Sequence, residues 1–342
     1  MLLYELNSDE MKKAIIASVS GLRADNEQDA ELLDRIYRTL SSEDISTKIA
    51  KSFIPPTQDD TFKLEPLLKI LTQMIYHSGV DYKSLVKFLD KLETGSVVNT
   101  SVVKTPGIGT VRSFFDGDET ATRIFQSIAT LGAGKKQKGP GEYALAMLSN
   151  KITLKDTGGD ISVDGAGIEV KAEMKTGGGR LGEGGPTAAV AKEYWTQLPS
   201  IANHISKQAT LGLDNFMKYL SIDLPLNDPE KKKQRQEMLG KWYDTIFKNP
   251  GPFVEAFMQD DSKRAEIMYG KANFDSYKAS HGFDSVLAIN FSNLKYICVN
   301  NGGDFAKYRE AGQFGAHGIS IIPSAASPKE VFVQLKLTMA KV

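Results

Sequence analysis

Cysteine is nearly absent from this sequence of 342 residues, which has a single one, Cys298. One cysteine excludes an internal disulfide and any zinc site built from several thiolates. Long apolar runs are also missing, because no stretch approaches the ~18 consecutive apolar residues that a membrane-spanning helix needs. The first residues lack a basic segment followed by an apolar one, so no secretory signal is predicted. These absences predict a protein without membrane contact in the cytoplasm, or, for a viral chain, in the host cytoplasm or the virion.

Net charge is a further quantity that the sequence lacks. The 42 Lys and Arg residues balance the 42 Asp and Glu residues, so the formal charge is zero. Many proteins that hold DNA by its phosphates alone are strongly basic, so the zero net charge of this chain does not place it among them. Residues 1–100 carry 12 basic and 16 acidic side chains, so the later part of the chain holds the compensating positive excess. A nucleic-acid surface is therefore expected after residue 100.

Hydrophobic periodicity divides the chain into three regions. Residues 1–98 show helical spacing and are predicted as an N-terminal helical domain, which could contact a protein partner or form a homodimer. Residues 99–129 are predicted as a linker and a helix. Residues 130–342 are predicted as the core, in this order: a helix at 141–152, a hairpin at 160–175, a glycine loop at 176–186, a helical insertion at about 187–280, and strands in the last sixty residues. This order predicts an α/β (α+β) class with a mixed central sheet flanked by helices.

The predicted hairpin separates apolar from charged side chains. In its second strand, Ile168 and Val170 alternate with Glu169 and Lys171. Side chains of a strand alternate between the two faces of the sheet. If the apolar side chains of both strands face one core, Asp160 of the first strand must share the opposite face with Glu169 and Lys171. The turn from Asp164 to Gly167 is a plausible tight connection.

Two carboxylates and an ammonium group on one face suit the hydrolysis of a phosphodiester. Carboxylate oxygens bind Mg²⁺, which keeps several waters and accepts a phosphate oxygen. A bound metal lowers the pKa of its water, and a lysine can orient that water or stabilise developing negative charge. The constellation of Asp160, Glu169 and Lys171 therefore predicts metal-assisted hydrolysis.

These residues resemble the PD-(D/E)xK nuclease superfamily, the restriction-endonuclease-like proteins that include phage-encoded members. The resemblance rests on Gly159-Asp160-Ile161 followed by Ile168-Glu169-Val170-Lys171-Ala172. Upstream, Glu142 matches an acidic residue that the superfamily often places on the helix before the hairpin. Glycine stands where the family name has proline. The resemblance is specific only over about residues 139–175.

The resemblance implies a role for each matching residue. Asp160 and Glu169 would bind the metal with help from the backbone carbonyl of Val170. Lys171 would act on the attacking water. Glu142, the fourth catalytic residue, would either support the metal ligands or bind a second metal ion. The implied cofactor is Mg²⁺, with Mn²⁺ expected to substitute, and the implied activity is a deoxyribonuclease, an endonuclease in preference to an exonuclease.

Basic residues flank the predicted centre on both sides. Lys135, Lys136 and Lys138 precede Glu142 in a glycine loop, and Arg180 follows the hairpin in another. All four are predicted to contact DNA phosphates, although solvated loops would look the same.

Two alternatives from other classes remain open. A non-catalytic structural or assembly protein, such as a virion protein, could retain a nuclease-like fold. A DNA-binding module could grip DNA without cutting it, which salt-dependent binding without cleavage would reveal.

Overall fold

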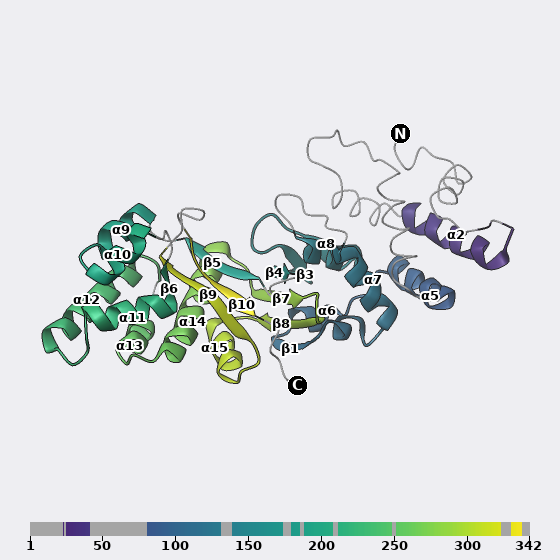
Figure 1. Cartoon of the computed structure of the whole chain (residues 1–342). Helices are drawn as coiled ribbons and strands as arrows, with labels where there is room; N and C mark the ends of the chain where they lie inside the picture. The colour runs from purple at the N-terminus through teal and green to yellow at the C-terminus, as the bar shows by residue number, and fades with distance from the viewer. Residues whose placement is uncertain are drawn as a thin grey trace. The chain divides into compact units, whose positions relative to one another are not determined.

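The chain has a mixed α/β fold, as predicted, in the computed structural model drawn in Figure 1. The structure describes residues 23, 25–41, 81–130, 139–173, 179–184, 188–207, 211–247, 251–322 and 330–336. The chain divides into two compact units, which are described separately. The first unit comprises Met1–Thr105, Gly109–Ala172 and Leu294–Tyr296, and the second comprises Pro106–Ile108, Glu173–Asn293 and Ile297–Val342. The predicted domain limits at residues 98 and 129 stay predictions.

The described strands form two sheets. The six-stranded sheet has the order β1-β8-β7-β4-β3-β2, and the four-stranded sheet has the order β5-β10-β9-β6. The strands of the first sheet are β1 (Gly107–Thr110), β2 (Ile152–Leu154), β3 (Ile161–Val163), β4 (Ala166–Glu173), β7 (Ser285–Asn290) and β8 (Lys295–Val299). Those of the second are β5 (Arg180–Gly184), β6 (Leu211–Gly212), β9 (Gly315–Ile322) and β10 (Glu330–Lys336). The strands predicted in the last sixty residues are confirmed as β7 to β10.

The first unit contains short helices packed around phenylalanine side chains. Its described helices are α2 (Glu27–Ser41), α5 (Tyr82–Glu93), α6 (Thr100–Lys104), the 3₁₀ helix η2 (Val111–Phe115), α7 (Glu119–Thr130) and α8 (Pro140–Met147). Asp81 caps α5 by accepting a hydrogen bond from the amide of Ser84, and Asn99 caps α6 in the same way. Phe114, Phe115 and Phe125 are fully buried between η2 and α7. Helix α8 packs against α7 and β2, which brings it close to the hairpin.

The helix predicted at 141–152 is wrong in its second half. Helix α8 ends at Met147, and Ile152 begins strand β2. Ile152 is fully buried, and its backbone is paired with Val163 of β3. Pairing with a neighbouring strand therefore overrides the helical spacing, because apolar periodicity over a short segment fits both structures.

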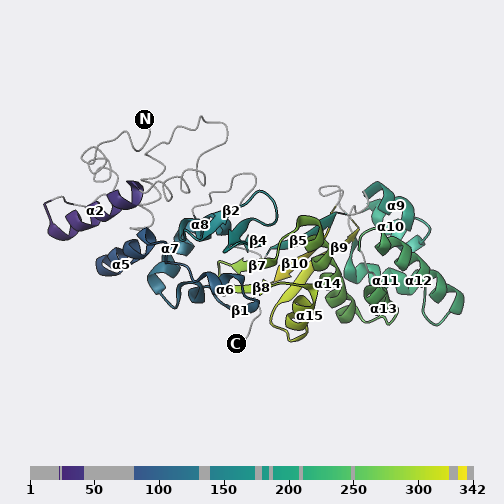
Figure 2. The ribbon, with the colours of Figure 1, turned by 180° about the vertical axis from the view of Figure 1, so that it is seen from behind.

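Helices make up most of the second unit. They are α9 (Ala188–Trp195), α10 (Pro199–Lys207), α11 (Leu213–Asp223), α12 (Pro229–Asp244), α13 (Gly251–Phe257), α14 (Ser262–His281) and α15 (Gly302–Glu310). The described residues of the segment predicted as a helical insertion are thus mostly helical, with the short β6 among them. Figure 2 shows α14 in front of the four-stranded sheet, and α14 contacts both β5 and β10. Its core is aromatic, with Trp195, Trp242 and Tyr243 almost fully buried.

The glycine loop predicted at 176–186 is corrected in part. Residues 180–184 form β5, which pairs antiparallel with β10 from Arg180 opposite Gln334 to Gly184 opposite Glu330. Leu181 is buried and anchors this strand. Glycine has no side chain, so the glycines in this segment leave no alternation of apolar and polar side chains from which β5 could be predicted. Within the described residues, no helix is both long and apolar enough to cross a membrane.

Candidate active site

The predicted hairpin is formed by β3 and β4. The backbone pairs Ile161 with Ile168 and Val163 with Ala166, so the connection is the two-residue turn Asp164-Gly165. The φ angles of these two residues are 49° and 88°, as expected for the tight turns that suit the twist of a hairpin. The predicted turn extended to Gly167, but Gly167 already pairs within the ladder.

The tip of the hairpin is tied to helix α6. The carboxylate of Asp164 accepts hydrogen bonds from the ammonium of Lys104 at 2.9 Å and from the hydroxyl of Thr100 at 3.0 Å. These two bonds lower the pKa of Asp164 below its ordinary value. The tip is therefore held by polar contacts, which leaves the other end of the hairpin to present the predicted catalytic residues.

Glu169 and Lys171 lie on the same face of β4, as predicted. The Nζ atom of Lys171 is 2.6 Å from Oε1 of Glu169, and both side chains are largely buried, at 22% and 10% exposed. Ile168 and Val170 are buried as well, so both faces of this strand are covered. A short bond between two shielded charges is strong because little water screens it.

Asp160 lies at the edge of β4, directly before the first residue of β3. Its amide donates to the carbonyl of Ile168, the residue that already pairs with Ile161, as in a β-bulge. Its carboxylate then accepts the hydrogen bond of the Val170 amide at 2.9 Å. The N–H and C=O of one strand residue point to the same edge, so the carbonyl of Val170 faces the side on which the Asp160 carboxylate lies.

A glycine-rich loop passes over β4 and delivers Asp160 to this position. Gly158 and Gly159 have φ angles of 71° and 103°, which favour glycine. A Cβ atom on Gly159 would come within 2.8 Å of the Ile168 backbone, and one on Gly167 would overlap the carbonyl oxygen of Gly158. The loop can lie directly on the strand only because these positions have no side chain.

Glu142 is buried in the first turn of α8, where it is only 5% exposed. Its carboxylate lies against Gly139, the residue that precedes the helix, because a Cβ atom there would be 2.9 Å from Oε2. A glutamate three residues after the N-cap commonly folds back in this way and interacts favourably with the helix N-terminus. Burial, together with the charge of Glu142, raises the pKa of the neighbouring Tyr143.

The carboxylates do not gather into a larger cluster. Among the residues that the structure describes, no group of three or more His, Cys, Asp or Glu side chains could hold a metal ion. Within the described part of the hairpin, oxygen donors could come from Asp160, Glu169 and the Val170 carbonyl, with water completing the shell. Mg²⁺ is often bound by one or two carboxylates and several waters, so this donor set fits Mg²⁺ in chemical type.

None of the four basic residues predicted to contact DNA belongs to the described residues of the first unit, which holds the hairpin. Lys135, Lys136 and Lys138 lie outside the described residues. Arg180 begins β5 in the second unit and is exposed. Sequence reasoning missed Lys155, whose amide donates to the carbonyl of Asp160 at 2.9 Å. The pair of glycines at 158 and 159 was the signal that a tight loop joins these two residues.

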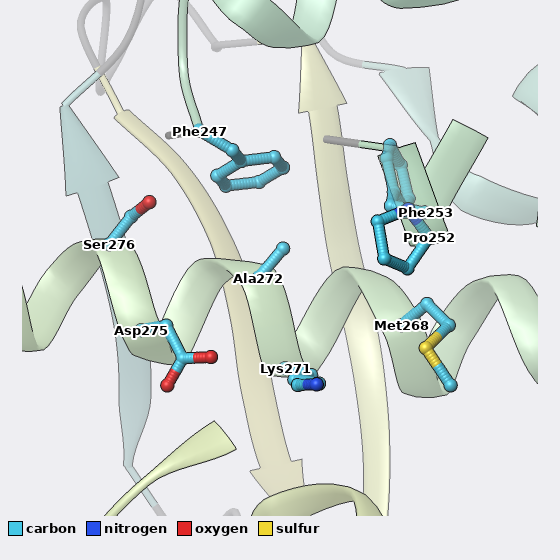
Figure 3. A pocket seen from close by; sticks show the side chains of 8 residues that line it. All are labelled: Phe247, Pro252, Phe253, Met268, Lys271, Ala272, Asp275 and Ser276. Carbon is cyan, nitrogen blue, oxygen red and sulfur yellow. The ribbon is translucent and has the colours of Figure 1, made fainter. Parts of the chain in front are cut away.

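The second unit contains a separate hollow, shown in Figure 3, that none of the predicted site residues lines. Phe247, Phe253 and Met268 form its apolar wall, and Lys271 and Asp275 of α14 contribute charge. Asp275 accepts a hydrogen bond of 2.7 Å from the amide of Gly302, at the start of α15. Its carboxylate therefore serves to hold the N-terminus of that helix.

Comparisons of the chain with models of known protein families, with curated proteins and with solved structures found no match. The function must therefore be argued from the geometry of the site.

Proposed function

We propose that this chain is a metal-dependent nuclease that hydrolyses phosphodiester bonds of DNA in the cytoplasm. The observation that carries the proposal is the buried contact between Glu169 and Lys171 on β4, together with the hydrogen bond that the Val170 amide between them donates to the carboxylate of Asp160. A core of the restriction-endonuclease-like kind is part of the proposal, supported by the mixed sheet and by α8 preceding the hairpin.

Mg²⁺, or Mn²⁺ in its place, would be held by Asp160, Glu169 and the Val170 carbonyl. When bound, such an ion supplies a polarised phosphate and a water of lowered pKa. The hydrogen bond from the Val170 amide orients the Asp160 carboxylate, and β4 fixes the Val170 carbonyl toward the same edge. This rigid backbone support suits a site that must hold its ligands in one geometry.

Lys171 would act on the reacting groups through its ammonium. Its Nζ atom is held at Glu169, so it is positioned without needing a further element. There it can orient the attacking water and stabilise the negative charge that develops on the phosphate. The low exposure of both side chains strengthens this electrostatic contribution.

The test is cleavage of plasmid and single-stranded DNA by the full chain with Mg²⁺ or Mn²⁺, with EDTA as the metal-free control. Glu169→Gln, Lys171→Ala and Asp160→Asn are each expected to reduce the rate by about 10²–10³-fold. Asp160→Asn is informative because the amide oxygen can still accept the Val170 hydrogen bond. Its effect therefore reports the lost charge and not a lost contact.

Asp164→Asn is the matched control. It removes an acidic group from the same hairpin and the ion pair with Lys104, while asparagine tolerates the positive φ. Cleavage by this variant should stay within about twofold of wild type, and circular dichroism should show that all variants fold. Equal loss in Asp164→Asn and Glu169→Gln would mean that hairpin stability, and not this centre, is being measured.

A structural or assembly role is the second candidate. It is favoured by the finding that, among the described residues, no group of three or more His, Cys, Asp or Glu side chains could hold a metal ion. If the folded wild-type chain cuts neither DNA nor RNA with either metal, this candidate replaces the nuclease.

A further inference from the structure

Lys155 lies next to Asp160 at the loop end of the β2–β3 hairpin, where the connection between the two strands begins and ends. Strands β2 and β3 pair from Ile152 opposite Val163 to Leu154 opposite Ile161. The next pair in this register is Lys155 and Asp160, and the amide of Lys155 donates to the carbonyl of Asp160 at 2.9 Å. The backbone therefore fixes Lys155 beside a proposed metal ligand.

The side chain of Lys155 reaches strand β4, which lies beyond β3 in the sheet. Its Nζ atom lies 3.5 Å from the position that a Cβ atom on Gly167 would occupy. Gly167 is two residues before Glu169, so both positions belong to the same face of β4. Lys155 is half-buried, and no acceptor for its ammonium is found within the part of the chain that the structure describes.

The charged face of β4 thus carries two ammonium groups. One lies over Gly167 and the other is bonded to the side chain of Glu169, and the backbone positions of these two residues are roughly 7 Å apart along the strand. Neighbouring phosphates of a nucleic-acid strand are separated by a similar distance. Two cations spaced in this way can hold two consecutive phosphates of one strand, whereas an isolated phosphodiester would use only one.

We propose that Lys155 binds the phosphate next to the one being cleaved, so that the site accepts a polynucleotide strand in preference to a small phosphodiester. This proposal rests on the proposed nuclease function. Lys155 is assigned a substrate-binding role and not a part in the chemical step, because its ammonium lies over Gly167 and not at Glu169.

The first experiment measures binding without hydrolysis. A fluorescein-labelled single-stranded oligonucleotide is titrated with the full chain in Ca²⁺, and fluorescence anisotropy is followed over a series of salt concentrations. Lys155→Gln should weaken binding severalfold and reduce the slope of log K against log salt by about one, because one phosphate contact is lost. Lys155→Arg should retain the wild-type slope, since arginine keeps the charge.

Lys151→Gln is the matched control. Lys151 is exposed, directly precedes β2, and acts by its charge on Asp164 at the tip of the hairpin. Its removal should leave the slope unchanged.

The second experiment compares two substrates with Mg²⁺ or Mn²⁺. Lys155→Gln should raise the KM for the oligonucleotide with little change in kcat. Hydrolysis of bis(p-nitrophenyl) phosphate, which has no second phosphate, should stay the same. A merely structural role would lower activity on both substrates alike, and that result would overturn the proposal.

Failure of this proposal can be told apart from failure of the nuclease proposal. Cleavage by wild type together with an unchanged salt slope in Lys155→Gln refutes the role of Lys155 alone. A slope that depends on Lys155 without any hydrolysis refutes the nuclease and keeps Lys155 as a phosphate contact. No binding of the oligonucleotide, or equal effects of Lys151→Gln and Lys155→Gln, overturns the role of Lys155 whatever the cleavage assay gives.

Discussion

A methyl group added at Gly167 would overlap the carbonyl oxygen of Gly158 in the loop that crosses β4. Both partners are backbone, so no flexible side chain can move aside and the loop itself must shift. Forcing extra atoms into such a packed site costs typically 1–3 kcal/mol, and rigid backbone on both sides places Gly167→Ala near ~3 kcal/mol. The loop ends in Asp160, so its displacement should release the hydrogen bond between Asp160 and Val170.

Gly165→Ala provides the comparison within the same hairpin. Gly165 has a φ of 88° but open space around its Cβ position, so this variant suffers backbone strain of about 1 kcal/mol without a clash. Because the chain has two units, a global unfolding curve need not be two-state, and a local probe is preferable. Hydrogen exchange of the Val170 amide, followed by mass spectrometry, reports the contact directly.

The two variants should differ clearly in that exchange rate. A local loss of ~3 kcal/mol in Gly167→Ala corresponds to roughly a hundredfold faster exchange of the Val170 amide. Gly165→Ala should change it by less than about tenfold. Equal protection of Val170 in Gly167→Ala and in wild type would refute the argument that the loop lies directly on the strand.

Two other predictions concern the second unit. Arg235 is fully buried on α12, donates to the carbonyl oxygens of Leu224 and Phe257, and forms an ion pair with Asp260. Arg235→Ala should therefore cost about 3–5 kcal/mol, measured locally by hydrogen exchange of the α12 amides, whereas the exposed Lys233→Ala on the same helix should cost under about 0.5 kcal/mol. Equal losses would contradict this role of the buried arginine. Burial raises the pKa of Cys298 to about 12. At pH 8 the folded protein therefore has a much smaller thiolate fraction than the unfolded one, and on this ground alone its thiol should react with a disulfide reagent roughly 10³-fold more slowly. The pKa of Cys298 is higher in the folded than in the unfolded protein. The stability that the neutral thiol contributes is therefore complete below about pH 8.5 and is lost as the pH rises toward 12. Rapid labelling of the native protein at pH 8 would contradict the burial of this thiol.

The sequence predicts the hairpin and one of its faces because alternation is a local property. Ile168 and Val170 mark the buried face, and the same alternation places Glu169 and Lys171 together on the other. The acidic residue of the preceding helix, Glu142, is likewise found in the first turn of α8. The alternation depends only on the period of one strand, whereas Glu142 is predicted from the resemblance to a nuclease superfamily.

What the sequence does not predict depends on contacts between elements. Asp160 leaves the regular ladder at a bulge, so its carboxylate bonds to the Val170 amide instead of following the alternation of β3. The residues of strand β2 have the apolar spacing of a helix, so the sequence does not predict this strand. The position of the Lys155 ammonium over Gly167 depends on the packing of the glycine loop against β4. Backbone pairing and close packing decide such features, and neither has a fixed period in the sequence.

The Glu169–Lys171 contact weighs differently on the two candidate functions. Removing two charges from water is costly, and replacing a buried ion pair by apolar side chains of similar volume is often neutral or stabilising. A hairpin that served only as a scaffold would therefore gain little stability from this pair, given the apolar neighbours Ile168 and Val170. The exposed pair between Lys104 and Asp164 already holds the tip of the hairpin at a smaller desolvation cost. The small gain in stability from this shielded pair therefore favours the proposed chemistry at a phosphate over the proposed scaffold role.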